Sequence, residues 1–287
     1  MFFADRALQA MADKDSVLCV GLDPHFEHIP QFLKQGNEPD EAIEAFLTEI
    51  IDAVAPHCAF VKPNTAFFEV WGAEGWLVLE RVSRHAREKG LLVIADAKRG
   101  DIGSTAATYA EAFLGEGRPF DAVTISPYLG QDGILPFVDV AAQTDKGVFV
   151  LVRTSNPSAS EFQDLPVGDC LLHEEVARSV ARIGEKVVGE AGFSAVGAVV
   201  GATEPEEIRI LRSELPGQLL LIPGYGAQGG GAADVAAGFY ENGKGAIVNS
   251  SRGIIFAGDG KDFALRAADA AERAKLELNA AIPHATR

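Results

Sequence analysis

The sequence predicts an α/β fold, a single (β/α)8 TIM barrel in which eight parallel strands alternate with helices around one core. Two observations predict this fold. Eight short apolar runs occur along the 287 residues, and longer amphipathic stretches separate them. The apolar runs are nearly continuous in aliphatic residues, as in strands that are covered on both faces. The same order of elements also fits a doubly wound sheet, which is the alternative fold.

The predicted strands lie at residues 17–22, 60–62, 91–95, 122–125, 147–152, 195–200, 219–222 and 245–248. Helices are predicted at 41–54, 76–89, 174–190 and 203–215. The first of these places Ile43, Phe46, Leu47 and Ile50 along one stripe, and the next two repeat that spacing. The last begins with a threonine followed by Glu-Pro-Glu-Glu, which puts acidic residues beside the positive end of the helix.

No tract rich in serine, proline or glycine divides the chain, which favours one domain over residues 1–287. The longest non-periodic segment, residues 156–169, follows the fifth predicted strand. In a barrel this segment is a long loop on the catalytic face, and we expect it to be a candidate lid.

Composition excludes several classes of function. Lys and Arg total 25 and Asp and Glu total 41, so the formal charge of −16 repels the phosphate backbone of nucleic acids. A small anionic ligand remains compatible, because a local basic pocket outweighs distant acidic groups. Cys19, Cys58 and Cys170 are odd in number and form no C-x-x-C pair, which indicates reduced thiols. With no signal-peptide pattern and no run of ~18 apolar residues, we expect a cytoplasmic protein without a membrane partner.

Polar residues gather directly after the predicted strands. In a barrel, the C-terminal ends of all strands converge on one mouth. The residues at these positions are Asp23, Lys62, Asn64, Asp96, Lys98, Asp101, Ser126, Thr154, Ser155, Asn156, the segment 223–230, and Ser250, Ser251, Arg252 and Gly253.

The third predicted strand ends in the most informative segment. Asp96 and Lys98 are two residues apart, so along a strand their side chains point to the same face. Asp101 follows Gly100, where we expect the chain to turn. An ordinary salt bridge explains Asp96 with Lys98, but it does not explain Lys62 at the matching position of the neighbouring strand, or Asp23 beside it. A network of Lys62, Asp96, Lys98 and Asp101 would provide the fixed charge that catalysis uses.

The segment after the seventh strand is rich in glycine. Gly224, Gly226 and Gly229 fit the dinucleotide string G-x-G-x-x-G, but no acidic residue ends the next strand. A phosphate site in the loops after strands seven and eight explains the same glycines, with Arg252 as a bidentate clamp. His25 and His28 have a spacing found in metal sites, yet no cluster of carboxylates or cysteines completes one, so no metal is expected.

The segment Asp96-Ala-Lys98-Arg-Gly-Asp101-Ile102 resembles the D-x-K-x-x-D-I signature of the orotidine 5′-monophosphate decarboxylase family. The similarity covers most of the chain. It extends through Val20-Gly-Leu-Asp23, Val61-Lys62-Pro-Asn-Thr, Thr154-Ser155, Pro223 to Gln228, and Asn249-Ser-Ser-Arg252-Gly, and the chain is similar to the longer bacterial subgroup.

The resemblance implies that the protein converts orotidine 5′-monophosphate to UMP and CO2 without a cofactor. It implies that Lys98 donates the proton that replaces CO2, that Asp96 lies beside the substrate carboxylate, and that Asp23 and Lys62 hold the ribose. The other implied contacts are Ser155 with the pyrimidine amide, Gln228 and Arg252 with the phosphate, Ile102 and Pro223 with the substrate, and Asp101 and Thr105 with the partner's site in a homodimer.

Two alternatives stay open at this point. One is a related sugar-phosphate decarboxylase or epimerase that uses Mg²⁺, because such enzymes share the Asp-x-Lys strand and the phosphate loops. The other is a non-catalytic barrel that binds a phosphate ligand, against which the predicted charge network argues.

Overall fold

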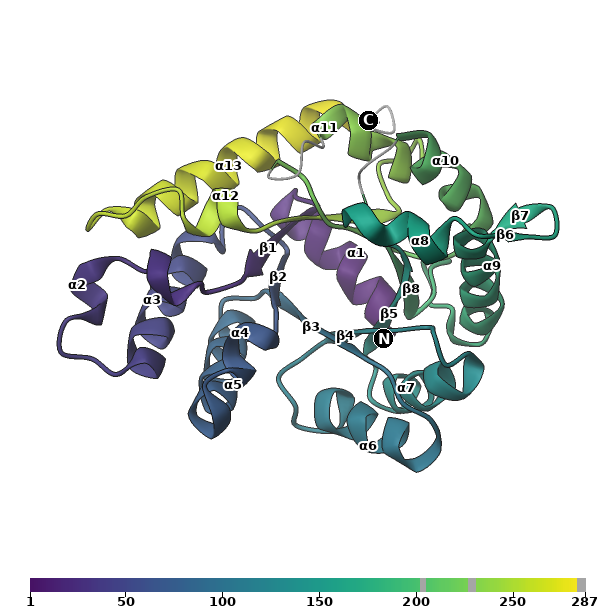
Figure 1. The fold of residues 1–287 in the computed structure, drawn as a ribbon. Coiled ribbons are helices and arrows are strands. Elements are labelled where there is room, and N and C mark those ends of the chain that lie inside the picture. The colour runs from purple at the N-terminus through teal and green to yellow at the C-terminus, as the bar shows by residue number, and fades with distance from the viewer. Residues whose placement is uncertain (202–204, 227–230, 283–287) are drawn as a thin grey trace.

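The computed structural model describes residues 1–201, 205–226 and 231–282. Eight parallel strands close into a barrel in the order β1-β10-β9-β8-β5-β4-β3-β2 (Figure 1). They are β1 (Leu18–Leu22), β2 (Phe60–Pro63), β3 (Leu92–Arg99), β4 (Ala122–Ile125), β5 (Gly147–Arg153), β8 (Val196–Val200), β9 (Leu220–Ile222) and β10 (Ala246–Ser250). The predicted barrel is confirmed and the doubly wound alternative is wrong, because β1 pairs with both β2 and β10 and so closes the sheet.

The strand bounds agree with the prediction to within two residues, except in β3. This strand was expected to end at residue 95, but it continues through Asp96 and Lys98 to Arg99. The strand was predicted to end where the apolar pattern meets charged side chains. In the structure the backbone continues to pair with β4 after a register shift between Ala95 and Arg99.

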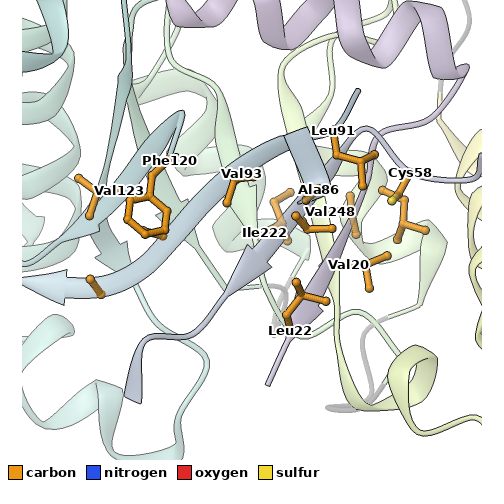
Figure 2. Packing of buried hydrophobic residues seen from close by; sticks show 14 of the residues in the cluster. Val20, Leu22, Cys58, Ala86, Leu91, Val93, Phe120, Val123, Ile222 and Val248 are labelled. Atoms are coloured by element: carbon orange, nitrogen blue, oxygen red, sulfur yellow. The ribbon is translucent and has the colours of Figure 1, made fainter. Parts of the chain in front are cut away.

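Alternate residues of the strands face two different cores. Outward residues such as Val20, Leu22, Val93, Val123 and Val248 pack against the surrounding helices (Figure 2). Inward residues form a second cluster that fills the barrel, with Cys19, Phe60, Ile94, Ala122, Phe149, Val199, Leu221 and Ile247 among its members. Both faces of the strands are therefore buried, as their continuous apolar character predicted.

The longer outer helices are α3 (Pro39–Val54), α5 (Gly72–Glu88), α6 (Gly103–Leu114), α7 (Gln131–Gln143), α9 (Leu172–Gly184), α10 (Pro205–Glu214) and α13 (Phe263–Ala281). Short turns of helix are α2 (Gln31–Lys34), α4 (Ala66–Glu69), α8 (Ser160–Gln163), α11 (Ala232–Val235) and α12 (Arg252–Ile255). None of the described helices is both long and apolar enough to cross a membrane.

Two helix predictions need comment. The helix predicted at 174–190 ends at Gly184, followed by a 3-10 turn at Glu185–Val187. The hydroxyl of Ser194 donates to the carbonyl of Gly184 over 2.8 Å, so a partner outside the helix satisfies this carbonyl. The helix predicted at 203–215 is described from Pro205, and residues 203–204 lie outside the described part of the chain.

An additional helix, α1 (Phe3–Lys14), closes the N-terminal end of the barrel and was not predicted. In Figure 1 it lies across the strands rather than in the ring of outer helices. The ring of Phe3 contacts Phe149 edge-on at 5.9 Å, and Arg6 donates to the buried carboxylate of Asp121 over 2.9 Å. Because α1 covers this end, the described part of the barrel leaves its C-terminal mouth as the place for a ligand.

Candidate active site

Above the apolar layer that fills the barrel lies a layer with polar side chains. Each member stands two residues after an inward apolar residue of the same strand, so it points inward as well. Lys62, Asp96, Thr124 and Asn249 follow Phe60, Ile94, Ala122 and Ile247 in this way. All four are less than 9% exposed.

Asp96 lies between two lysines. Its Oδ2 is 2.8 Å from Nζ of Lys62 on β2, and its Oδ1 is 2.6 Å from Nζ of Lys98 on its own strand. The side chains of Lys62 and Asp96 are 7% and 9% exposed, whereas that of Lys98 is 47% exposed. The pair Lys62–Asp96 is thus enclosed, and Lys98 projects from it into the mouth.

Burial and charge act in opposite directions on the pKa values of the enclosed pair. Burial alone would lower the pKa of Lys62, but the carboxylates of Asp96 and Asp23 outweigh burial and raise the pKa above its usual value. Burial would likewise raise the pKa of Asp96, but the two lysines reverse this and hold it well below its usual range. Both groups are therefore charged, and each holds the other in place.

The backbone at Lys98 is unusual. Its φ of 47° lies in the left-handed region, next to the register shift in the pairing of β3 with β4. The backbone N–H of Lys98 donates to Oγ1 of Thr124 on β4 over 3.0 Å. The prediction that Asp96 and Lys98 meet is confirmed by their ion pair, but the strand achieves this through a bulge rather than by regular alternation.

At the ends of β1 and β10, on the side of the mouth next to Lys62, Asp23 and Asn249 have unused acceptors. Oδ2 of Asp23 accepts the hydroxyl of Ser251 over 2.5 Å. Within the described residues, Oδ1 of Asp23 and Oδ1 of Asn249 are buried and have no hydrogen-bond partner. Such atoms are costly unless a donor satisfies them, so they are suited to a ligand that brings hydroxyl or amide hydrogens.

Asp101 does not join the charge network within one chain. Its Oδ1 accepts the backbone N–H of Ile102 over 2.8 Å, and its carboxylate forms no ion pair in the described ranges. The chain has turned after Gly100, as expected, so Asp101 stands at the start of α6. Ile102 is 53% exposed and Thr105 is also exposed. The predicted four-charge network is therefore a three-charge network in the single chain.

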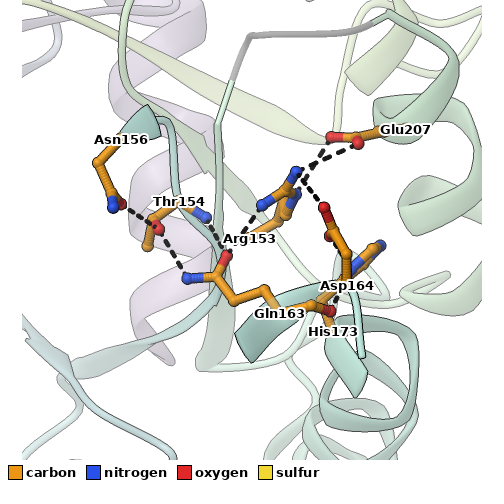
Figure 3. A network of polar contacts seen from close by, with 7 residues as sticks. All are labelled: Arg153, Thr154, Asn156, Gln163, Asp164, His173 and Glu207. Carbon is orange, nitrogen blue, oxygen red and sulfur yellow. Dashed lines mark hydrogen bonds and ion pairs between the residues drawn. The ribbon is translucent and has the colours of Figure 1, made fainter. Parts of the chain in front are cut away.

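A second polar cluster surrounds Arg153 and Thr154 at the end of β5 (Figure 3), and Ser155 follows them in the chain. Gln163 of α8 accepts the backbone N–H of Thr154 over 2.9 Å and donates to its hydroxyl over 2.7 Å. Arg153 donates to Glu207 of α10 and to Asp164, each over 3.2 Å. The segment 156–169 is thus tied to the rim at several points and contains a 3-10 turn, α8 and the strand β6 (Pro166–Val167), which pairs with β7 (Cys170–Leu171). Its role as a lid stays a prediction.

A cavity of about 660 Å³ opens between the ends of β4 and β5 and the helices α8 and α9. Ser126, Leu151, Thr154 and His173 are among its lining residues, and most of the remaining lining is apolar. Leu151 stands two residues after the inward Phe149, so the cavity adjoins the polar layer on the side of Thr124. This is a volume suited to a small organic ligand.

The predicted phosphate loops lie at the ends of β9 and β10. Pro223 is half-buried directly after β9, and Arg252 is exposed at the start of α12 and forms no ion pair in the described part of the chain. A hollow of about 280 Å³ between these loops and α13 is lined partly by Gly226, Ser250 and Gly253. Gln228 lies outside the described residues.

The two histidines with metal-like spacing pack edge-on in an aromatic cluster. His25 lies 5.9 Å from His28 and 4.5 Å from Phe67 between ring centroids. No group of three side chains of the types His, Cys, Asp or Glu that could hold a metal ion occurs among the described residues.

Thr124 was not among the polar residues predicted at the mouth, and Asn249 and Ser251 were given no role there, although Ser251 was placed directly after the eighth strand. Thr124 was counted within an apolar run, although its position two residues after Ala122 gives it the same inward direction as Asp96 two residues after Ile94. Applying the two-residue period to every strand, rather than only to residues beyond the strand ends, would have found it.

These features define a (β/α)8-barrel protein with a lysine–carboxylate–lysine site at the C-terminal mouth, the end at which TIM barrels carry their active sites. The sequence profile of the family described as "Orotidine 5'-phosphate decarboxylase / HUMPS family" matches residues 16–267. The chain belongs to this family, so the resemblance of its motifs is confirmed.

The chain is similar over nearly its whole length to curated relatives. It is 44% identical to "Orotidine 5'-phosphate decarboxylase" of Rhodopirellula baltica, with 97% of this chain and 98% of the relative covered. It is 42% identical to the protein of the same name from Caldicellulosiruptor bescii, with 98% and 99% covered. Among solved structures, Leishmania donovani OMP decarboxylase is 36% identical and superposes with a TM-score of 0.81 over 98% of each chain.

Proposed function

We propose that this protein removes the carboxylate of orotidine 5′-monophosphate to give UMP and CO2. The observation that carries the proposal is the placement of Lys98, whose ammonium projects into the mouth while Asp96 holds it at 2.6 Å. The names of the full-length relatives support this substrate.

The chemistry requires a cation at the reacting carbon. When the C6–carboxylate bond breaks, its electron pair stays on C6 in an orbital that the ring cannot delocalise. The ammonium of Lys98 stabilises this developing negative charge and then transfers a proton to C6. Lys98 is left neutral and regains a proton from solvent. The proposed reaction uses no cofactor, because these residues supply both the charge stabilisation and the proton.

Asp96 contributes less by repelling the substrate carboxylate than by holding Lys98. Two like charges ~4 Å apart repel by about 4 kcal/mol at an effective dielectric constant near 20. The largest enzymatic accelerations require on the order of 20 kcal/mol. Repulsion alone is therefore too small, and stabilisation of the transition state by the fixed ammonium provides the larger part.

The remaining proposed contacts are those that the resemblance to the family implies. The unused Oδ1 of Asp23, with the ammonium of Lys62 near it, suits the two ribose hydroxyls. Arg252, together with Gln228 and the backbone after Pro223, would bind the phosphate. Ser155, next to the cavity at the end of β5, would contact the pyrimidine amide.

We further propose that the protein works as a homodimer. Asp101 and Thr105 stand at the exposed start of α6, where Ile102 also presents an apolar side chain to the surface. A partner that covers this face would receive Asp101 and Thr105 at its own mouth, with Ile102 against its substrate. The dimer would thereby restore the fourth charge that is missing from the network of a single chain.

The chain would act as one catalytic domain over residues 1–287, in the cytoplasm. Its three cysteines are free thiols, which a reducing compartment would maintain.

The decisive experiment follows the ultraviolet absorbance of orotidine 5′-monophosphate in the presence of purified protein that has been treated with a chelator. We expect the absorbance to fall and UMP to form. Activity that appears only after Mg²⁺ is added would favour the Mg²⁺-dependent sugar-phosphate enzymes, which should be tested with their own substrates. Binding of nucleotide without turnover would favour the non-catalytic alternative.

A further inference from the structure

Among the described residues, Thr124 is the only neutral side chain that forms hydrogen bonds with both Asp96 and Lys98. It stands on β4, beside the strand that carries both of them, and is 1% exposed. Its hydroxyl donates to Oδ1 of Asp96 over 2.9 Å and accepts the backbone N–H of Lys98 over 3.0 Å.

In these two bonds the hydroxyl donates its one hydrogen and also accepts a hydrogen. A threonine hydroxyl has a single hydrogen to donate, and here it goes to the same carboxylate oxygen that receives Nζ of Lys98 over 2.6 Å. The backbone of Lys98, the hydroxyl of Thr124, the carboxylate of Asp96 and the ammonium of Lys98 therefore form a closed ring of hydrogen bonds. A change at any member displaces the others.

The backbone N–H that Thr124 accepts belongs to the residue with left-handed φ. A lysine in this conformation carries a steric cost, since its Cβ approaches the following carbonyl, and the conformation persists only where neighbouring groups hold it. The register shift between Ala95 and Arg99 leaves Lys98 without a regular strand partner on β4. The side chain of Thr124 occupies the place of that partner.

We propose that Thr124 is a positioning residue for the reaction, which sets both the rotamer of Asp96 and the backbone of Lys98 so that the ammonium points at the reacting carbon. The inference rests on the proposed decarboxylation, because it assigns Lys98 the role of proton donor. Thr124 itself touches no reacting atom in this mechanism.

The chain offers a matched set of variants. Thr124→Val keeps the shape of the side chain and removes the hydroxyl, whereas Thr124→Ser keeps the hydroxyl and removes the methyl group. Thr144→Val is the control, because the hydroxyl of Thr144 donates to the carbonyl of Val140 over 2.8 Å at the end of α7, away from the mouth. The kinetic constants of all three are measured with orotidine 5′-monophosphate.

We expect Thr124→Val to lower kcat on the order of 100-fold, the scale of a misplacement by about 1 Å, and to change KM by less than about threefold. The kcat of Thr124→Ser should remain within about fivefold of that of the unchanged protein, and the kcat of Thr144→Val should equal that of the unchanged protein. Neither substitution disturbs the ring of hydrogen bonds. A crystal structure of Thr124→Val should show the Lys98 backbone leaving the left-handed region or the Asp96 carboxylate rotated.

Two results would overturn the proposal. One is a Thr124→Val protein with unchanged kcat, and the other is a Thr124→Ser protein as impaired as Thr124→Val, which would assign the effect to the methyl group. If Thr124→Val does not fold, the serine variant still decides, because a large loss of kcat in folded Thr124→Ser contradicts the proposal. If the unchanged protein lacks decarboxylase activity, the proposed function fails, whereas the crystal structure still tests whether Thr124 holds Lys98 and Asp96.

Discussion

Nζ of Lys62 lies 2.8 Å from Oδ2 of Asp96, on neighbouring strands of the barrel and with both side chains almost fully enclosed. An enclosed ion pair of this kind is unfavourable to form unless further bonds satisfy both charges. Asp96 has these bonds, from Lys98 and Thr124 at its other oxygen. The Lys62–Asp96 pair therefore fixes the carboxylate that holds the exposed ammonium of Lys98. Changes to this pair should affect stability as well as catalysis.

The first prediction concerns the dependence of stability on pH. The folded-state pKa of Asp96 is lowered from its usual 3.8, so its contribution to stability is present above that pH and is lost as the pH falls through the folded-state value. The pKa of Lys62 is raised from 10.5, so its contribution is complete below that pH and is lost only as the pH rises further. Between these limits the pair should contribute a constant amount.

Urea unfolding at pH 7, 4, 3 and 2 tests the acidic side. The free energy of unfolding should fall more steeply below about pH 4 in the unchanged protein than in Asp96→Asn, which has no carboxylate to protonate. Glu116→Gln, which alters an exposed carboxylate, is the control and should follow the unchanged protein. Parallel curves for the unchanged protein and Asp96→Asn would contradict the assignment.

The second prediction concerns Lys98→Ala. Removing the ammonium takes away both the charge that stabilises the carbanion and the proton that replaces CO2, so turnover should fall by at least about 10⁴-fold. UMP should still bind, because the phosphate and ribose contacts remain, and calorimetry with UMP measures this. Appreciable residual decarboxylation would refute the role of Lys98 as proton donor.

The third prediction concerns Arg252→Ala. An exposed guanidinium without an ion pair in the described chain is free to clamp an anion, and a charge-assisted contact of this kind contributes about 1.5–3 kcal/mol. KM for orotidine 5′-monophosphate should therefore rise roughly 10- to 100-fold. Orotidine, which lacks the phosphate, provides the control substrate, since its weaker turnover should not change between the two proteins. Unchanged kinetics with the phosphorylated substrate would show that the phosphate binds elsewhere.

The fold and the charged part of the site could be predicted because they depend on patterns within short segments. Eight apolar runs with helices between them specify the barrel, and lysine and aspartate at the ends of such runs are conspicuous. Thr124 was missed because a neutral side chain inside a strand differs little from its apolar neighbours until its direction is known. Asn249 was given no role because the eighth strand was predicted to end at residue 248, whereas β10 extends to Ser250. The bulge at Lys98 depends on the pairing of β3 with β4, which the sequence of β3 alone does not specify.

Helix α1 was missed for a different reason. Its buried face consists of Phe3, Ala4, Ala7 and Met11, so two of the four apolar positions are alanines. Small residues fit beneath the barrel, where the strand ends leave limited space, but they give little apolar contrast along the sequence. The position of Asp101 is also beyond the reach of local patterns, since its proposed neighbours belong to another copy of the chain.

The fourth prediction tests how closely α1 fits the barrel. A Cβ at Gly147 would lie 2.3 Å from Cδ1 of Phe3 and 2.7 Å from its Cγ. Gly147→Ala should lower the free energy of unfolding by about 1–3 kcal/mol, the usual cost of overpacking, without altering the residues of the mouth. Gly217→Ala is the control, because the nearest atom to its Cβ would be 3.8 Å away. Combining Gly147→Ala with Phe3→Leu should recover part of the loss, and purely additive effects would show that the two residues are not in contact.

The fifth prediction tests the shared site. If Asp101 acts in the partner's mouth, Lys98→Ala and Asp101→Ala inactivate different sites when the two variants form a mixed dimer. One mouth then carries both defects, and the other carries an intact Lys98 with an intact Asp101 from the partner. After random mixing, about half of the dimers are mixed, and each mixed dimer has one working mouth out of two. The mixture should therefore regain about one quarter of the unchanged activity, although each variant alone is inactive. The measurement is decarboxylation after the two variants are unfolded and refolded together.

Equal mixing of Lys98→Ala with Asp96→Ala is the control and should regain nothing, because both residues belong to the same mouth. A mixture of the first pair that stays inactive, despite forming dimers, would place Asp101 in the mouth of its own chain.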